Sequence, residues 1–450
     1  MADLTYQGLL LDKAGHTKLN LSNGEAVIYS PYGSGKAFVL SGVALKVYKL
    51  LESGLTVEEI INTAQSPEWE ETVQAVIAYF TDRGLFADKR KTKTFSAAKK
   101  PKSIALWIHV TDTCNLRCDY CYVHKGKRRL SKEACDVIVS ALKADTETFQ
   151  IKEVELKFAG GEPLVDIEIV SYFMDQARAA LLPLGVKIHL AIITNGTLVT
   201  DEKAKFLKNE AFSVMVSLDG LGDFNNARKY ADGRTSVHQV LEGIECLLNA
   251  GVRPTILTTV SDTNVEGLWD LMIYVREKGL TLSLSPSRDY EQELGLKMNV
   301  EHISNEMVVF LHKVCLLPDS DLPRLSFNGI QFTGGRTHIC GGGSNYFAVD
   351  PDAGVCFCQM TVDKPMGLVT DKDSILSFAT SQDTILEGGE CLTCIWKNVC
   401  CGGCAVLAMN AGTFGKPSVM CDLMKRILPS ILLYEGRKIR RLKERKTCLP

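Results

Sequence analysis

Three cysteines lie within eight residues in the stretch TCNLRCDYCY at positions 113–122. They are Cys114, Cys118 and Cys121, which gives the spacing C-x3-C-x2-C. Structural zinc sites and iron–sulfur clusters usually take four protein ligands. Three thiolates on one short loop therefore leave one metal position open. The sequence predicts that another part of the chain, or a bound small molecule, fills this position.

The composition is that of an ordinary globular chain. Of 450 residues, 46% are hydrophobic and 23% are charged, and a chain of this length holds about three domains. The formal net charge of −2 argues against nucleic-acid binding, which usually comes with a basic surplus. The sequence has no apolar run of roughly 20 residues, and MADLTYQG lacks the regions of a signal peptide. We expect a cytoplasmic protein that binds neither nucleic acid nor membranes.

The chain has 16 cysteines, and without a secretory signal metal binding is a better explanation for them than disulfides. Three lie in the first loop, and nine lie between Cys340 and Cys421. Three more fall in helix-like segments, where we expect inert thiols: Cys135, Cys246 and Cys315. Cys448 remains unassigned.

The first 88 residues are predicted to form a separate α+β module. Strand-like runs come first, at 4–11, 16–21, 25–30 and 36–42. Three helix-like stretches follow, at 43–54, 56–65 and 68–86. This order is typical of a winged-helix-like module. Residues 89–103 are basic and poor in large apolar side chains, which indicates a solvated linker.

Residues 104–315 alternate between short apolar strands and helices. Strands are expected at 105–110, 154–160, 187–196, 212–220, 253–261 and 280–287, with helices between them such as 166–181, 237–251 and 265–279. This alternation predicts an α/β domain with a parallel sheet, and six units suggest an open, partial (β/α)6 barrel. Active sites in such sheets lie beyond the carboxyl ends of the strands. The cysteine loop follows the first strand and therefore falls at that position.

Other strand ends carry further polar groups. The sequence GGEP follows the second strand, and its glycines and Glu162 suit close contact with an ammonium group. Asn195 follows the third strand, and Ser217 and Asp219 follow the fourth, where they suit ribose hydroxyls. Arg228 suits a carboxylate. The pairs Asn-Gly at 195–196 and Asp-Gly at 219–220 are also common in ordinary turns. Only their placement at successive strand ends indicates a binding site.

The cysteine motif, with an aromatic residue before its last cysteine and GGEP after the next strand, resembles the radical S-adenosylmethionine (SAM) superfamily over roughly residues 104–290. That resemblance implies a [4Fe–4S] cluster on the three cysteines. Its open iron binds the amine and carboxylate of SAM, and cleavage of SAM yields a 5′-deoxyadenosyl radical. The implied SAM contacts are Tyr120, Gly160, Gly161, Glu162, Pro163, Asn195, Ser217, Asp219 and Arg228. The alternative is a zinc loop.

The later cysteines resemble a SPASM extension, which holds two auxiliary [4Fe–4S] clusters in radical SAM peptide-modifying enzymes. From Cys391 the spacing is C-x2-C-x5-C-x3-C. By that likeness the distal cluster has the ligands Cys391, Cys394, Cys400 and Cys421, and the proximal cluster has Cys340, Cys358 and Cys404. We take residues 316–450 as this SPASM domain and C-terminal tail. A zinc site is the alternative for such cysteine pairs.

This sequence departs from the SPASM pattern in two places. The usual glycine five positions before the second cysteine is replaced by Ala353, and Gly354 follows it. Tyr346 stands where members with a fully ligated proximal cluster have an extra cysteine. Cys356 and Cys401 lie beside the expected ligands, so either could be a substitute ligand or a bystander.

The N-terminal module resembles the PqqD-like element that binds leader peptides in maturases of ribosomally made peptides. The resemblances together imply an enzyme that installs thioether crosslinks, of sactipeptide or ranthipeptide type, in a precursor peptide. They also imply an electron donor such as flavodoxin or ferredoxin. Carbon–carbon crosslinking and side-chain oxidation of the sulfatase-maturase kind are alternatives. The N-terminal module could instead serve dimerisation, or bind DNA in a non-catalytic iron–sulfur sensor.

Overall fold

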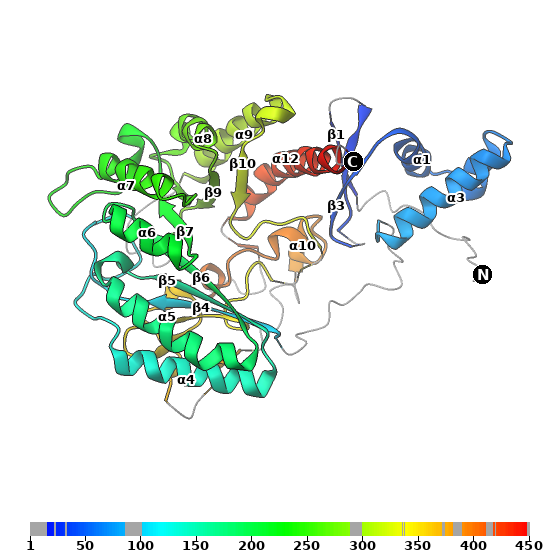
Figure 1. The fold of residues 1–450 in the computed structure, drawn as a ribbon. Coiled ribbons are helices and arrows are strands. Elements are labelled where there is room, and N and C mark those ends of the chain that lie inside the picture. Colours follow the sequence, from blue (N-terminus) through cyan, green and yellow to red (C-terminus); the bar gives the residue numbers. More distant parts are fainter. Residues whose placement is uncertain are drawn as a thin grey trace.

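A ten-stranded sheet forms the body of the molecule in the computed structural model (Figure 1). The structure describes residues 16–21, 24–31, 34–85, 101–288, 299–334, 336, 338–370, 374–380, 389–410, 417–418 and 420–447. The strand predicted at 4–11, nearly all of the predicted linker and Cys448 lie outside these residues. No helix in the described parts of the chain is long and apolar enough to cross a membrane.

Six parallel strands at the centre of the sheet confirm the predicted partial barrel. They are β4 (Ser103–His109), β5 (Glu153–Ala159), β6 (Lys187–Thr194), β7 (Ser213–Ser217), β8 (Thr255–Val260) and β9 (Thr281–Pro286). Helices connect them in turn: α4 (Lys132–Phe149), α5 (Ile167–Leu181), α6 (Asp201–Asn209), α7 (Val237–Asn249) and α8 (Leu268–Glu277). The helices lie along the outer face of the curved sheet (Figure 1). Because the strands are parallel, their carboxyl ends meet at one edge.

Local sequence fixes where several of these helices begin. Ser131 precedes α4 and accepts a hydrogen bond from the backbone N–H of Ala134. Thr200 caps α6 in the same way through Lys203. A cap of this kind stabilises a helix by about 1 kcal/mol. The caps therefore hold the loops that follow β4 and β6 at defined positions.

The C-terminal segment extends the barrel sheet at both edges, which the sequence did not predict. Strand β10 (Arg324–Phe327) pairs in parallel with β9, and β11 (Tyr346–Val349) pairs in parallel with β4. Strands β12 (Gly354–Cys356) and β13 (Gly367–Leu368) continue beyond β11 in antiparallel pairing. Pairing with β4 brings the cysteine-rich segment next to the strand that leads into the first cysteine loop.

The N-terminal module has the predicted order over its described residues. Strands β1 (Thr17–Asn20), β2 (Ala26–Tyr29) and β3 (Ala37–Leu40) precede α1 (Gly42–Glu52), α2 (Val57–Asn62) and α3 (Pro67–Asp82). Successive side chains of a strand point to opposite faces. Ile28 accordingly packs with the helices of the module, whereas Val27 and Tyr29 belong to the main core.

The long helix α12 (Cys421–Thr447) joins the module to the barrel. It lies between them in Figure 1 and packs against β2, β3 and α9 (Val300–Leu316). The approach to β2 is close, because a side chain at Gly436 would lie 2.7 Å from Cβ of Val27. Tyr29 also stacks on Trp396, with ring centroids 5.5 Å apart. Strand β2 is therefore buried on both faces of the N-terminal sheet.

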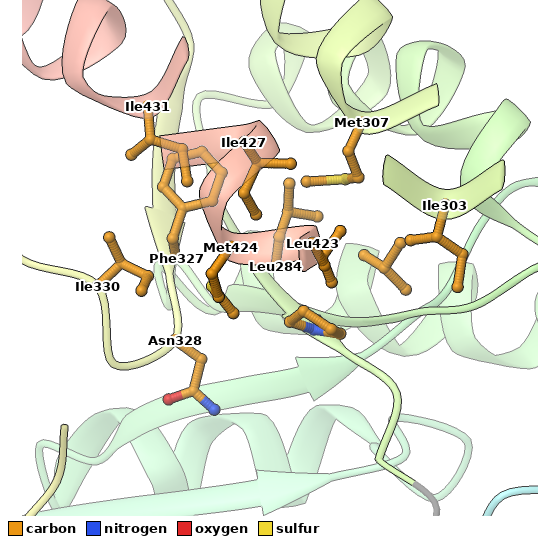
Figure 2. Close-up of a pocket in the computed structure, with 12 residues that line it drawn as sticks. Leu284, Ile303, Met307, Phe327, Asn328, Ile330, Leu423, Met424, Ile427 and Ile431 are labelled. Carbon is orange, nitrogen blue, oxygen red and sulfur yellow. The ribbon is translucent and has the colours of Figure 1, made fainter. Parts of the chain in front are cut away.

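Aliphatic side chains fill the junction between α9, α12 and the barrel strands (Figure 2). Leu284, Met307 and Ile427 come together there from β9, α9 and α12. The cavity that remains is about 10 Å³, and its walls are almost entirely apolar. A space of this size and polarity holds no ligand and stays dry. The junction serves packing.

Candidate active site

A cavity of about 600 Å³ opens at the carboxyl ends of the barrel strands. Its walls combine thiols from two distant parts of the sequence. The cysteines that line it are Cys114, Cys118 and Cys121 from the first loop, and Cys340, Cys358 and Cys404 from the C-terminal segment. The structure therefore brings together six of the ten predicted cluster ligands in one space.

The first cysteine loop follows β4 and is held at both of its ends. The N–H of Leu130 donates to the carbonyl of Val110 (2.9 Å), and the N–H of Asp112 donates to the carbonyl of Arg128 (3.1 Å). Inside the loop, the N–H of Leu116 donates to Sγ of Cys114 (3.4 Å). The thiols are thus presented by a loop of fixed shape.

Close packing in the structure explains why the two positions in GGEP are glycines. A side chain at Gly160 would lie 2.7 Å from the carbonyl oxygen of Thr111, and one at Gly161 would lie 2.2 Å from that of Thr113. Gly160 also has φ +138°, which suits glycine. The glycines therefore let the loop after β5 pack directly on the cysteine loop. From the sequence alone, the freedom of these glycines is expected to serve contact with a ligand.

The carboxylate of Glu162 is buried and bonded within the chain. It accepts hydrogen bonds from Oγ1 of Thr194 (2.7 Å), from the N–H of Asn195 (2.7 Å) and from the N–H of Leu164 (3.1 Å). Burial raises the pKa of Glu162, and these hydrogen bonds act against that rise. Glu162 lines the cavity and also fixes the end of β6.

The other residues predicted to contact SAM at the strand ends divide into two sets. Asn195 and Ser217 line the cavity, and Nδ2 of Asn195 lies 3.8 Å from Sγ of Cys114. Pro163 and Asp219 do not line it. Pro163 starts a short 3-10 helix that ends at Val165. These two residues therefore support the wall of the cavity.

Tyr120, Asp219 and Arg228 form a buried polar group at the cavity wall. The hydroxyl of Tyr120 donates to the carboxylate of Asp219, and Nη1 of Arg228 donates to the hydroxyl of Tyr120 (2.6 Å). Nε of Arg228 is buried and has no hydrogen-bond partner among the described residues. A buried guanidinium N–H without a partner costs free energy, so the site is suited to an anionic ligand.

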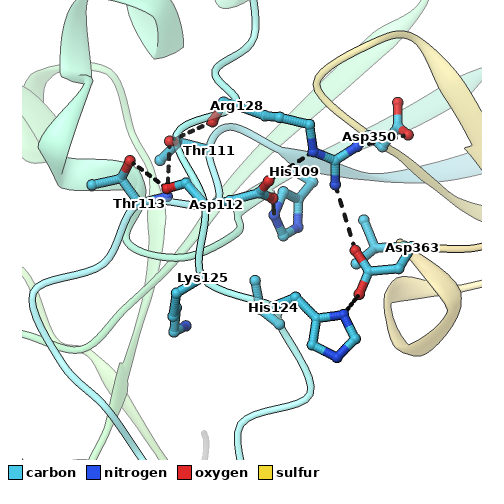
Figure 3. A network of polar contacts seen from close by, with 12 residues as sticks. His109, Thr111, Asp112, Thr113, His124, Lys125, Arg128, Asp350 and Asp363 are labelled. Atoms are coloured by element: carbon cyan, nitrogen blue, oxygen red, sulfur yellow. Dashed lines mark hydrogen bonds and ion pairs between the residues drawn. The ribbon is translucent and has the colours of Figure 1, made fainter.

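A network of charged side chains links the cysteine loop to the C-terminal strands (Figure 3). Nε of Arg128 lies 2.7 Å from Oδ2 of Asp112, and its Nη atoms reach Asp350 (3.6 Å) and Asp363 (3.4 Å). Buried His109 contacts Asp112 through Nε2 at 3.0 Å. Arg128 therefore connects the first loop with the strands that lead to Cys358.

Among the cysteines that the structure describes, none joins the second group of thiols at the cavity as a fourth ligand. Tyr346 lines the cavity, and its hydroxyl donates to Oε1 of Gln359. Cys356 lies in a separate small core with Trp107, and its thiol lies 3.7 Å from two backbone carbonyls. In an unbroken strand, residues two apart share a face. Strand β12 ends at Cys356, and the chain then turns so that Cys358 faces the cavity.

A third group of thiols lines a smaller cavity of about 30 Å³. Its cysteines are Cys391, Cys394, Cys400 and Cys421. Cys401 follows Cys400 but is buried elsewhere, with its thiol 3.6 Å from the carbonyl of Arg336.

Ala353 stands at the position that glycine usually occupies in the SPASM pattern, and its φ is +63°. The left-handed backbone is thus kept without the glycine.

Burial makes several of these thiols weaker acids. It raises the pKa of Cys118 to about 11 and the pKa values of Cys358 and Cys400 to about 12. Thiols in this range are protonated at neutral pH, whereas metals bind thiolates. Cluster binding must therefore release these protons, which makes occupancy depend on pH.

The first loop and its surroundings fit a [4Fe–4S] cluster with bound SAM. Three thiols share one cavity, its volume suits a ligand of this size, and Arg228 offers an unpartnered N–H to a carboxylate. Across the described parts of the chain, no group of three or more His, Cys, Asp or Glu side chains is placed to hold a metal ion. This is expected for thiols that bind different irons of one cluster.

Two lysines that line the cavity, Lys125 and Lys157, are not predicted from the sequence. Nζ of Lys125 lies 3.1 Å from Sγ of Cys121, and Nζ of Lys157 lies 3.5 Å from Oε1 of Glu155. The spacing of four residues from Cys121 to Lys125 is visible in the sequence. Without the fold of the loop, however, it does not separate Lys125 from the exposed Lys127.

The barrel that carries this cavity is similar to known proteins. Residues 108–273 match the family model of the Radical SAM superfamily. A cysteine-type anaerobic sulfatase-maturating enzyme from Clostridium perfringens is 26% identical over 317 residues, which are 65% of this chain and 85% of that protein. A serine-type enzyme from Bacteroides thetaiotaomicron is 29% identical over 194 residues, 42% of this chain and 46% of that protein.

Solved structures share the fold. Native anSMEcpe with bound AdoMet has a TM-score of 0.62 at 22% identity, covering 77% of this chain and 100% of that one. Streptococcus suis SuiB bound to precursor peptide SuiA has a TM-score of 0.50 at 13% identity, covering 91% and 98%. Residues 108–273 of the chain are thus similar to the Radical SAM superfamily, whose cofactors are a [4Fe–4S] cluster and SAM.

Proposed function

We propose that this radical SAM protein is a peptide maturase that joins a cysteine sulfur of its substrate to a carbon atom in a thioether. The observation that carries the proposal is the shared cavity. The thiols of the first loop face the same space as Cys340, Cys358 and Cys404. A peptide in that space would contact the SAM site on one side and a second thiol group on the other.

In this proposal Cys114, Cys118 and Cys121 hold the radical cluster. Arg228 binds the SAM carboxylate through its unpartnered N–H. The remaining contacts to SAM come from residues that line the cavity, namely Asn195, Ser217 and the backbone of Gly160 to Glu162. Tyr120, Asp219 and Pro163 act by support, since Tyr120 and Asp219 hold Arg228 and Pro163 shapes the loop.

When bound, the reduced cluster and SAM supply a carbon radical that removes a hydrogen atom from the substrate. The chain's own residues place that substrate. Ser283 and Ser285 of β9 offer hydroxyls inside the cavity, and Trp107 and Phe357 give apolar surface for a side chain. A walled cavity of this kind keeps water away from reactive groups and holds the reacting atoms close together.

The C-terminal thiols are the proposed ligands of two auxiliary [4Fe–4S] clusters. The proximal group faces the substrate cavity, whereas the distal group has its own cavity. The proximal group would take up the second electron of the reaction, and the distal group lies on a route to an external carrier such as flavodoxin or ferredoxin. We take residues 316–450 as this auxiliary domain and 104–315 as the barrel.

The N-terminal module, residues 1–88, is the proposed leader-binding element, joined by the linker at 89–103. Its strand β3 contacts the C-terminal segment, since the N–H of Ala37 donates to the carbonyl of Phe332 (3.1 Å). Among the residues that the structure describes, β1 pairs with β2 alone. An edge of this kind can take an additional strand from a peptide. We expect the leader to add there.

A second candidate is oxidation of a side chain in a protein substrate. Relatives named as sulfatase-maturating enzymes match this chain over most of their length. The two reactions differ in the product. Thioether formation loses two hydrogens and keeps the sulfur, whereas maturation of a cysteine to an aldehyde loses the sulfur. Mass spectrometry of the modified peptide separates them.

The test of the proposal replaces Cys114, Cys118 and Cys121 together by Ala. The protein should fold and keep its C-terminal iron, because the thiols proposed to bind that iron lie in other segments of the chain. Reductive formation of 5′-deoxyadenosine should disappear. The Cys246→Ala variant is the matched control, since this thiol lies on α7 outside the cavities lined by the proposed ligands. Cleavage of SAM by the triple variant would reject the site.

A further inference from the structure

Lys125 stands out among the charged side chains at the cavity, because it contacts a thiol of the first loop directly. Its Nζ lies 3.1 Å from Sγ of Cys121. Cys114 has weaker donors, the N–H of Leu116 at 3.4 Å and Nδ2 of Asn195 at 3.8 Å. Lys125 is thus a close, positively charged donor to this group of thiols.

The backbone holds Lys125 in place. Its neighbour Gly126 accepts a hydrogen bond from Oγ1 of Thr113 at 3.2 Å. A side chain at Gly126 would lie 3.1 Å from Oδ2 of Asp112, so the loop passes close to that carboxylate. Arg128 then ties the same loop to Asp112 and to Asp363 (Figure 3). The ammonium group is therefore directed at Cys121 by a loop that is anchored on both sides.

Such a contact remains available after the sulfur binds iron, because a ligating thiolate keeps lone pairs that accept hydrogen bonds. Hydrogen bonds to cluster sulfurs and nearby charge are main determinants of iron–sulfur reduction potentials. Reduction adds one electron, taken from an external low-potential donor, and breaks no bond. A donor with a positive charge stabilises the additional negative charge more than a neutral donor does.

We propose that Lys125 is a positioning residue that donates to the cluster-binding sulfur of Cys121 and raises the reduction potential of the radical cluster. The inference depends on the proposed cluster site. It adds that one side chain, Lys125, controls how easily a donor of the flavodoxin or ferredoxin class reduces that cluster.

The test compares Lys125→Met, Lys125→Arg and Lys127→Met in the full, cluster-loaded protein. Lys125→Met keeps the length of the side chain but loses the donor, and Lys125→Arg keeps a charged N–H. Lys127 is exposed on the same loop and serves as the matched control. Each protein is titrated anaerobically against potential while the reduced-cluster resonance signal that changes on addition of SAM is recorded.

At the native midpoint, the ratio of reduced to oxidised cluster should be at least tenfold lower in Lys125→Met, which corresponds to a shift of at least about 59 mV to more negative potential. Lys125→Arg and Lys127→Met should stay close to the native midpoint. An unchanged midpoint in Lys125→Met, or an equal shift in Lys127→Met, overturns the inference. So does an equal shift in Lys125→Arg.

Two further controls separate the possible failures. If the native protein has no SAM-responsive signal, the proposed cluster site itself is wrong. If the signal is present and Lys125→Met does not shift it, only the role of Lys125 is wrong. Iron content is measured throughout, with Lys125→Gln as a second neutral variant. Loss of the cluster from both neutral variants, with full iron in Lys127→Met, would mean that Lys125 retains the cluster and does not tune it.

Discussion

Cys400 and Cys404 are four residues apart in sequence, yet their thiols line different cavities. The reason is a run of left-handed backbone between them, with φ of 50° at Cys401, 77° at Gly402 and 88° at Gly403. The N–H of Gly403 donates to the carbonyl of Cys400 (2.9 Å), which closes the turn. One tight turn therefore connects the two C-terminal groups of thiols.

This turn should depend on glycine at position 403. A side chain at Gly403 would lie 2.7 Å from Cβ of Ser418, in addition to the left-handed backbone. We expect Gly403→Ala to lower the free energy of unfolding by more than the roughly 1–2 kcal/mol of the backbone term alone. Gly185→Ala is the control, because Gly185 has φ +73° and open space around it. Thermal unfolding and iron content of the two variants check this; equal effects would contradict it.

The fold of the barrel could be predicted from the sequence, and the contacts of its loops could not. Alternation of apolar strands and helices is a local signal, so β4 to β9 appear where the pattern places them. The pairing of β11 with β4 joins residues more than two hundred positions apart, and no local pattern carries it. The same holds for Asp219, whose carboxylate supports Tyr120 rather than lining the cavity.

Arg228 should decide the affinity for SAM. Lys has no planar fork and no Nε, so Arg228→Lys loses the unpartnered donor at the cavity. We expect the Kd for SAM to rise about tenfold, which is about 1.4 kcal/mol. Tyr120→Phe should weaken binding less, because it removes only the hydroxyl that links Arg228 to Asp219 and leaves the guanidinium in place. Equilibrium dialysis measures both, with Arg234→Lys as the control, since Arg234 is exposed and pairs with Asp232. Unchanged affinity in Arg228→Lys would remove the carboxylate assignment.

Leader binding can be tested at β1, which forms an edge of the N-terminal sheet over the residues that the structure describes. The N–H of Leu21 donates to the carbonyl of Glu25, and antiparallel strands alternate, so the N–H of Asn20 points away from β2. Asn20→Pro should remove a donor that a leader strand would use, and edge strands tolerate proline at such positions. We expect binding of a leader peptide to weaken about tenfold, while Asn20→Ala binds normally. Fluorescence anisotropy with a labelled leader gives both values.

Deletion of residues 1–88 is a coarser version of the same test. It should abolish or severely weaken leader binding while SAM cleavage survives. It also uncovers Trp396, on which Tyr29 stacks, close to the distal group of thiols. The substitution at Asn20 avoids this change. If the native protein, the deletion variant and Asn20→Pro bind the leader with equal affinity, this would argue against the module as the binding element.

The proximal group should leave one iron open for the sulfur of the substrate. Cys340, Cys358 and Cys404 supply three thiolates, and Tyr346 already donates its hydroxyl to Gln359. Cys356 is buried in a different core with its thiol toward the carbonyls of Gly354 and Val362. Closing the cluster with Cys356 would require it to leave that core. An open iron can bind a substrate thiol, lower its pKa and hold the sulfur near the carbon radical.

The measurement uses the variant that lacks Cys114, Cys118 and Cys121, so that only the C-terminal clusters contribute to the resonance spectrum. Addition of a cysteine-containing core peptide should change the spectrum, and the change should disappear when the peptide cysteines become serine. Cys356→Ala in the same background should respond like its parent, because Cys356 is not expected to be a ligand. An unchanged spectrum with peptide shown to be bound would mean that another group closes the cluster. A response that appears only in Cys356→Ala would identify Cys356 as that group.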